Sequence, residues 1–111
     1  MNNTAQMILL DNKPVLLISH YLTGVEAIDF QEKYQQLLQN YPLPRQIICD
    51  FSQTQFIDSS GIGALVRNYK MAREKGVELI LKGVQPQVML ALDIVGLSRV
   101  FTFETLAENE E

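Results

Sequence analysis

Short apolar runs alternate with helix-length amphipathic segments along almost the whole chain, and this alternation constrains the fold more than any other feature. Runs rich in aliphatic and β-branched residues predict strands at 6–10, 15–18, 45–51, 77–81 and 100–103. The segments after Thr23, after Ser59 and from Pro86 carry apolar residues at helical spacing and predict three helices. The order β-β-α-β-α-β-α-β predicts an α/β fold with a mixed or largely parallel sheet and helices packed against it.

Local signals mark where the predicted elements begin and end. Asp11, Asn12, Lys13 and Pro14 form a polar connection that predicts a hairpin between the first two strands. Thr23 and Glu26 have the spacing of a capping box, and Pro42 ends the helix that follows. Gly76 and Gly96 are expected to end the second and third helices. The third helix is expected to face the core with Val88, Ala91, Leu92 and Val95.

Size and charge limit the possible organisation. The chain has 111 residues, of which 47% are hydrophobic, so we expect one domain over 1–111 with a frayed polar tail from about 104 to 111. A net charge of −4 without a Lys/Arg cluster disfavours nucleic-acid binding. Without a signal peptide or an apolar run of roughly 20 residues, the chain is expected to be cytoplasmic and independent of membranes. The lone cysteine, Cys49, is expected to fill space in the core.

The stretch Phe56-Ile57-Asp58-Ser59-Ser60-Gly61-Ile62-Gly63 places two hydroxyl groups and two glycines at the start of the second helix. Unpaired N–H groups and the positive end of the helix dipole make such a position suitable for a phosphate. Ser59 is therefore the candidate modification site, with Ser60 as the secondary one. The plain alternative is that Asp58 or Ser59 serves only as the N-cap of the helix.

The same residues carry a resemblance to a known family. Asp58-Ser59-Ser60-Gly61-Ile62-Gly63, followed by Arg67-Asn68-Tyr69-Lys70, resembles the signature of bacterial anti-sigma factor antagonists, which are single STAS domains. Val95-Gly96-Leu97-Ser98-Arg99-Val100-Phe101 resembles the family's exit from its last helix, and the element order fits nearly the whole chain. One departure is Thr23, which stands where family members often carry an acidic residue.

The resemblance implies a switch between partners. In the family, the serine after the aspartate is phosphorylated by an anti-sigma factor that is also a serine kinase, and a PP2C-type phosphatase removes the phosphate. This role corresponds to Ser59, and the chain itself is expected to need no cofactor, since ATP and Mg²⁺ belong to the kinase. The expected partner-binding residues are Asp58, Ser59, Ser60, Gly61, Ile62, Gly63, Arg67 and Lys70. Gly61 and Gly63 are expected to let a partner approach the hydroxyl closely.

Other kinds of site have less support in the sequence. The two glycines lack the third glycine of a dinucleotide fingerprint. Asp50 ends a predicted strand but lacks the acidic pair that a phosphoacceptor aspartate needs for its metal. His20 has no second ligand at metal-binding spacing, and the cationic flank of Arg67, Lys70 and Arg73 is either a solvated face or a dock for an acidic partner.

Three functional classes remain open at this point. The favoured one is a phosphorylation-switched anti-sigma factor antagonist. The alternative is a STAS scaffold or ligand-binding module that does not switch and acts on a target other than a sigma factor. The least supported is a small enzyme, because the chain offers one histidine and scattered carboxylates rather than a paired acid and base.

Overall fold

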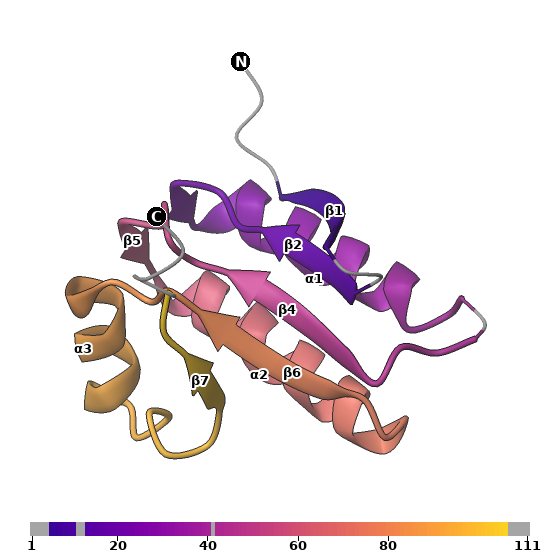
Figure 1. The fold of residues 1–111 in the computed structure, drawn as a ribbon. Helices are drawn as coiled ribbons and strands as arrows, with labels where there is room; N and C mark the ends of the chain where they lie inside the picture. The colour runs from indigo at the N-terminus through magenta and orange to yellow at the C-terminus, as the bar shows by residue number, and fades with distance from the viewer. Residues whose placement is uncertain (1–4, 11–12, 41, 107–111) are drawn as a thin grey trace.

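A five-stranded mixed sheet forms the frame of the molecule, which a computed structural model describes at residues 5–10, 13–40 and 42–106 (Figure 1). The strand order is β1-β2-β4-β6-β7. Only β1 and β2 are antiparallel, and every other neighbouring pair is parallel. The strands are β1 (Gln6–Leu10), β2 (Lys13–Leu17), β4 (Gln46–Asp50), β6 (Glu78–Lys82) and β7 (Thr102–Glu104). The prediction of a mixed sheet opened by a hairpin is confirmed.

The ends of several expected segments differ from the structure. The first helix ends at Leu37, five positions before Pro42, and β7 starts at Thr102 instead of position 100. Lys13 and Pro14 belong to β2, although the sequence assigned them to the turn. Asp11 and Asn12, the rest of that turn, lie outside the described residues. Glu104, where the tail was expected to begin, is the last residue of β7, and its carbonyl accepts a hydrogen bond from the Gly83 N–H at 2.9 Å. The tail residues 107–111 also lie outside the described part of the chain.

Three helices connect the strands: α1 (Gly24–Leu37), α2 (Ser59–Glu74) and α3 (Pro86–Ile94). In Figure 1, α1 and α2 lie together behind the sheet, whereas α3 lies on the side of the molecule away from β1. Among the described residues, none of these helices has the length and apolar character that crossing a bilayer requires. Gly76 follows α2 with φ +73°, a conformation that glycine adopts without strain, so the predicted end of this helix is confirmed.

The start of α1 differs from the predicted capping box. Thr23 is the N-cap residue, but its side chain makes no capping hydrogen bond. Its hydroxyl lies 3.4 Å from Glu26 Oε1 instead, so the two side chains interact with each other. The spacing of the motif therefore predicted where the helix starts and was wrong about how the threonine is used.

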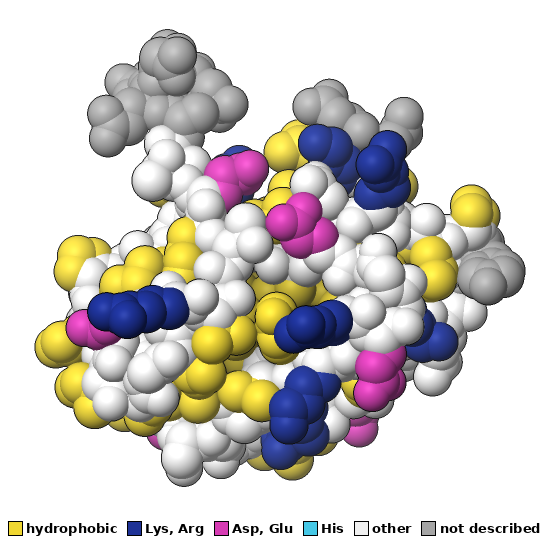
Figure 2. All heavy atoms as spheres, turned by 90° about the horizontal axis from the view of Figure 1, so that it is seen from below, with side chains coloured by type: hydrophobic (Ala, Val, Ile, Leu, Met, Phe, Trp, Pro, Cys, Tyr) yellow, Lys and Arg dark blue, Asp and Glu magenta, His cyan; other side chains and the backbone are white. Residues whose placement is uncertain are grey.

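Helix α3 leaves part of its apolar surface uncovered. Val88 and Leu92 are buried and Ala91 packs against the core, as predicted. Val95 is 52% exposed because α3 ends at Ile94 and Gly96 turns the chain away, so its assignment to the core was wrong. Figure 2 shows hydrophobic side chains gathered toward the left of the view, the side on which Figure 1 places α3. Exposed apolar residues of this region are Leu90, Ile94, Val95 and Val100.

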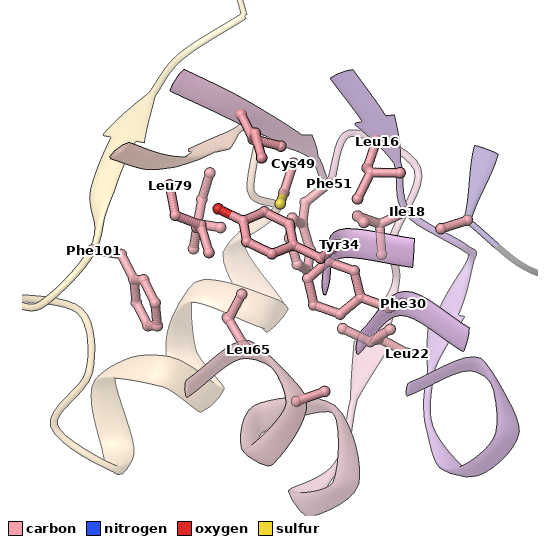
Figure 3. Close-up of a cluster of buried hydrophobic side chains, with 14 of the residues drawn as sticks. Leu16, Ile18, Leu22, Phe30, Tyr34, Cys49, Phe51, Leu65, Leu79 and Phe101 are labelled. Carbon is pink, nitrogen blue, oxygen red and sulfur yellow. The ribbon is translucent and has the colours of Figure 1, made fainter. Parts of the chain in front are cut away.

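The main core lies between the sheet and helices α1 and α2 (Figure 3). Phe30 and Tyr34 of α1 are fully buried and pack edge to face, with ring centroids 6.2 Å apart. Figure 3 shows Leu65 of α2 and Cys49 of β4 pointing into the same cluster. Cys49 is fully buried, so its prediction as core filler is confirmed. Burial, aided by the nearby negative charge of Asp50, raises the pKa of the Cys49 thiol well above its usual range.

A second, two-stranded parallel sheet joins β3 (Tyr21–Leu22) to β5 (Phe56–Ile57). It was not predicted from the sequence, because strands of two residues are too short to show a period. Tyr21 pairs with Phe56, and Leu22 pairs with Ile57. This small sheet ends directly before Asp58, so it ties the start of α2 to the segment that leads into α1.

Candidate functional site

The first turn of α2 presents Ser59 at the surface. Asp58 has an extended backbone, with φ −110° and ψ −171°, and its Oδ1 accepts a hydrogen bond from the Gly61 N–H at 3.0 Å. Asp58 is therefore the N-cap, and Ser59 is the first residue of the helix. Ser59 and Ser60 are both exposed, whereas Asp58 is half-buried. The side chain of Ser59 is thus accessible to a modifying enzyme, while the carboxylate of Asp58 already satisfies a backbone donor.

Gly61 is needed for internal packing. A Cβ atom at this position would lie 2.2 Å from the Leu22 carbonyl oxygen and 2.7 Å from Ile57 Cγ1, and both distances are far shorter than any normal contact. Gly61 is also buried. The expectation that its missing side chain admits a partner is therefore wrong: the absence of a Cβ lets α2 approach the small sheet closely.

Gly63 has a different environment, which is occupied by Arg67. A Cβ atom on Gly63 would lie 3.3 Å from Arg67 Nη1 and 3.4 Å from Nη2. The Nε of Arg67 donates a hydrogen bond of 2.7 Å to Oε1 of Gln31 on α1. Residues four apart on a helix lie on the same face, so Ser59, Gly63 and Arg67 follow one line along α2. The guanidinium group therefore lies beside Gly63, one helical turn along α2 from Ser59.

Apolar side chains are exposed beside this turn. Tyr21 and Phe56, partners in the small sheet, are 49% and 54% exposed. Val25 and Ile28 are exposed in the first turns of α1, which begins directly after β3. Large apolar side chains that stay uncovered next to an accessible hydroxyl are typical of a surface that another protein covers. Tyr21 and Phe56 could not be identified from the sequence, because their proximity depends on the unpredicted sheet.

The remaining candidate residues do not form a second site. Asp50 Oδ1 accepts a hydrogen bond from the Ser52 N–H at 2.8 Å, so the carboxylate stabilises the loop after β4. Within the described ranges, no group of three potential ligand side chains could hold a metal ion. His20 is exposed at the rim, as predicted, and its carbonyl accepts a hydrogen bond from the Gln55 N–H. Lys70 and Arg73 are exposed farther along α2.

A hollow of about 870 Å³ lies at the opposite end of the sheet, where β2, β4 and β6 begin. Lys13, Arg45 and Lys75 contribute to its lining. This group of cations was not evident in the sequence, because the three residues are distant from one another in the chain. The chain reaches Ser59 after it leaves the carboxyl end of β4, whereas the hollow lies where β4 begins. The hollow is therefore remote from the candidate modification site.

The fold and the first turn of α2 together define a single α/β domain of the STAS type. A STAS domain model matches residues 5–109, and the chain belongs to this family. It is 37% identical over 54 residues to the anti-sigma F factor antagonist of Paenibacillus polymyxa, covering 49% of this chain and 46% of that protein. It is 26% identical over 76 residues to the anti-sigma-B factor antagonist of Listeria monocytogenes, covering 67% of each. The chain thus aligns with about half the length of the first relative.

Solved structures of STAS proteins share the fold. The anti-sigma factor antagonist SpoIIAA in its unphosphorylated form superposes with a TM-score of 0.77 at 20% identity, covering 96% of this chain and 91% of that one. The Bacillus SpoIIAA in its phosphorylated form gives a TM-score of 0.73 at 18% identity, covering 96% and 95%. Identities this low establish the common fold alone. The sequence relatives are named as antagonists of other regulatory proteins rather than as enzymes.

Proposed function

We propose that this protein is an anti-sigma factor antagonist that works by switching partners. In its unphosphorylated form it binds an anti-sigma factor that is also a serine kinase, and the target of that factor is released. Phosphorylation of Ser59 abolishes the binding, and a PP2C-type phosphatase restores it. The observation that carries the proposal is the exposure of Ser59 at the first position of α2, directly after the capping Asp58.

The folded domain can accept a phosphate at Ser59. A phosphoserine adds about −1.5 to −2 charges and three acceptor oxygens, which the positive end of the α2 dipole favours. The neighbouring carboxylate of Asp58 opposes it, but this group is held toward the Gly61 N–H. The Arg67 guanidinium lies beside Gly63, one helical turn from Ser59. Because the arginine side chain is long and flexible, we expect it to turn toward the phosphate and compensate its charge. Phosphorylation is therefore expected to leave the domain folded.

The same charge would oppose a partner. Binding over Tyr21 and Phe56 would remove their exposed rings from water and would cover Ser59, which follows Phe56 by three positions. A charged group left unpaired in such an interface costs on the order of 2–5 kcal/mol. This range corresponds to a loss of roughly 30-fold to several-thousand-fold in affinity. A loss of affinity of this size is enough for one phosphate to release the bound partner.

Binding to the purified anti-sigma factor kinase of the same organism tests the proposal. Ser59→Ala should bind like the unmodified protein and resist phosphorylation, whereas Ser59→Asp should bind at least roughly 30-fold more weakly. Ser60→Ala is the matched control, because it removes a neighbouring exposed hydroxyl and should still be phosphorylated. Mass spectrometry after incubation with ATP identifies the site. Equal affinities for all the variants would contradict the switch and favour a STAS scaffold with another target.

The role of Arg67 can be tested on the phosphorylated protein alone. Phosphorylation of Ser59 should stabilise the wild-type protein against heat more than it stabilises Arg67→Gln. The difference between the two effects should correspond to about 0.3–1 kcal/mol, the usual size of a charge interaction at an exposed helix end. Arg73→Gln is the matched control, because its cation lies roughly 21 Å farther along the helix axis than Ser59. An identical effect of phosphorylation in all three proteins would show that Arg67 does not contact the phosphate.

A further inference from the structure

The two edges of the main sheet differ in how they are protected. At one edge, β7 has three residues, of which Glu104 carries a charge. At the other edge, β1 has five residues, Gln-Met-Ile-Leu-Leu, without a charge or a proline. An edge strand presents unpaired N–H and C=O groups, and proteins usually protect such edges with charges, prolines, bulges or short strands. Within the described residues, β1 shows none of these protections.

The apolar side chains of β1 are also uncovered. Met7, Ile8, Leu9 and Leu10 are between 47% and 65% exposed, so both faces of the strand remain in contact with solvent. The strand is nevertheless held in place where it begins. The Ala5 N–H donates to Asp29 Oδ2 at 2.9 Å, Lys33 Nζ donates to the Ala5 carbonyl, and Asp29 and Lys33 form an ion pair of 3.2 Å. An anchored, apolar edge strand is already ordered for pairing with another strand.

We propose that β1 pairs with β1 of a second copy of this chain, antiparallel and centred on Ile8, so that two sheets become one. In this register Ile8 faces Ile8, Met7 faces Leu9 and Gln6 faces Leu10 of the other copy. The two positions of each pair are both even or both odd, so their side chains point to the same face of the joined sheet. No charge of either strand opposes another, although each copy has a net charge of −4.

The apolar row on the face of the sheet opposite the main core supports a second copy as the occupant. Val15, Ile48 and Ile80 form a buried cluster separate from the main core. Strand register places Ile80 beside Ile48, Ile48 beside Val15, and Val15 beside Ile8. The row therefore ends at Ile8, which is half-exposed on the edge strand. Pairing of Ile8 with its counterpart would join this row to the identical row of the second copy, so that one apolar row crosses both sheets.

The size of the contact predicts a weak dimer. A stable interface buries about 800 Å² on each partner, roughly a tenth of the surface of a small protein. The accessible surface of this chain is 6803 Å², and a five-residue strand is a small part of it. We therefore expect a monomer–dimer equilibrium that depends on concentration. The edge at β1 lies away from the small sheet and α3 in Figure 1, so the dimer would leave Ser59 accessible.

Sedimentation equilibrium from micromolar to millimolar concentrations measures the association. The wild-type protein should shift from monomer to dimer, and Ile8→Lys should remain monomeric because two like charges would face each other at the centre of the pair. Ile94→Lys on α3 is the matched control, since it makes the same change at another exposed isoleucine, and it should dimerise like the wild type. A wild-type chain that stays monomeric throughout, as it would if this edge served another partner's strand, would overturn the proposal.

Disulfide cross-linking tests the register. Directly opposed residues of antiparallel strands have Cα atoms about 4.5–5.5 Å apart, which suits a disulfide, so Ile8→Cys should cross-link rapidly under mild oxidation. Gln6→Cys is the matched control on the same strand, because its two copies would lie roughly 13 Å apart. The native Cys49 is buried and should not react in either variant. Equal cross-linking at positions 6 and 8, or none at position 8, would overturn the proposed register.

Discussion

The starts of helices α1 and α2 look alike in sequence but differ in structure. Each has a polar capping residue and a glycine in the first turn. At α1, Thr23 makes no capping hydrogen bond, and Gly24, with φ +46°, has open space where a Cβ would lie. At α2, the carboxylate of Asp58 caps the helix, and Gly61 lies against the carbonyl of Leu22. Glycine thus serves backbone conformation at one helix and close packing at the other.

This difference determines how well Ser59 is positioned. The start of α1 depends on the conformation of consecutive residues. The start of α2 is also in contact with β3 and β5, since both Leu22 and Ile57 approach Gly61. A rigid contact at the third residue of the helix holds Ser59, two positions earlier, in a defined place beside Tyr21 and Phe56. The comparison predicts that the glycines and the capping residues at the two helix starts respond differently to substitution, while exposed positions that neither cap nor pack respond alike.

The largest effect is expected for Gly61→Ala. Its new Cβ would overlap the backbone of β3, and overpacking of this kind costs about 1–3 kcal/mol, so we expect a loss near the upper end. Gly24→Ala is the matched control at α1, where only the positive φ opposes the substitution, at about 1 kcal/mol. Urea unfolding measures both changes. An equal loss at the two positions would show that the close contact at α2 contributes nothing.

Substitution of the two capping residues should change the free energy of unfolding by smaller amounts. Asp58→Ala should lower the free energy of unfolding by about 1 kcal/mol, because the Gly61 N–H loses its acceptor. Thr23→Ala should cost only about 0.5 kcal/mol or less, since the threonine side chain makes no capping bond. The two variants are compared by thermal and urea unfolding under the same conditions. A larger loss at Thr23 would mean that the two helix starts use their caps in the same way.

The smallest effect is expected for a negative charge at the exposed positions. Ser59→Asp gains from the helix dipole and loses from the adjacent Asp58, so its stability should stay within about 0.5 kcal/mol of the wild type. Val25→Asp, at a 73% exposed position in the first turn of α1, should behave similarly. Unfolding curves of both variants are the measurement. A loss above about 1.5 kcal/mol for Ser59→Asp would contradict the expectation that the start of α2 accommodates the added charge.

Local patterns in the sequence predicted the elements of the main sheet and the three helices. Periodicity and capping are properties of neighbouring residues, so Asp58 could be identified as a possible cap and Gly76 as the end of α2. The same reasoning was wrong at Val95, because the apolar period continued one residue beyond the point where the helix ends. It was also wrong about the Thr23 hydroxyl, which interacts with a neighbouring side chain instead of the backbone.

The small sheet shows the limit of this reasoning. Two-residue strands have no period, and the pairing of Tyr21 with Phe56 joins segments that are distant in the chain. The contact of Gly61 with Leu22 depends on that pairing. The hydrogen bond between Arg67 and Gln31, 36 residues apart, depends on how α1 packs beside α2. The sequence indicated that these residues matter but could not indicate what they touch.

The sequence by itself determined that a serine hydroxyl lies at the start of an amphipathic helix, because a polar cap and apolar residues at helical spacing depend only on neighbouring residues. Only the tertiary structure decided what surrounds that hydroxyl: a glycine packed against β3, an arginine held by α1, and two exposed rings from the small sheet. The physical reason is that these neighbours come from separate segments, and only the packing of the helices and the two sheets brings them together.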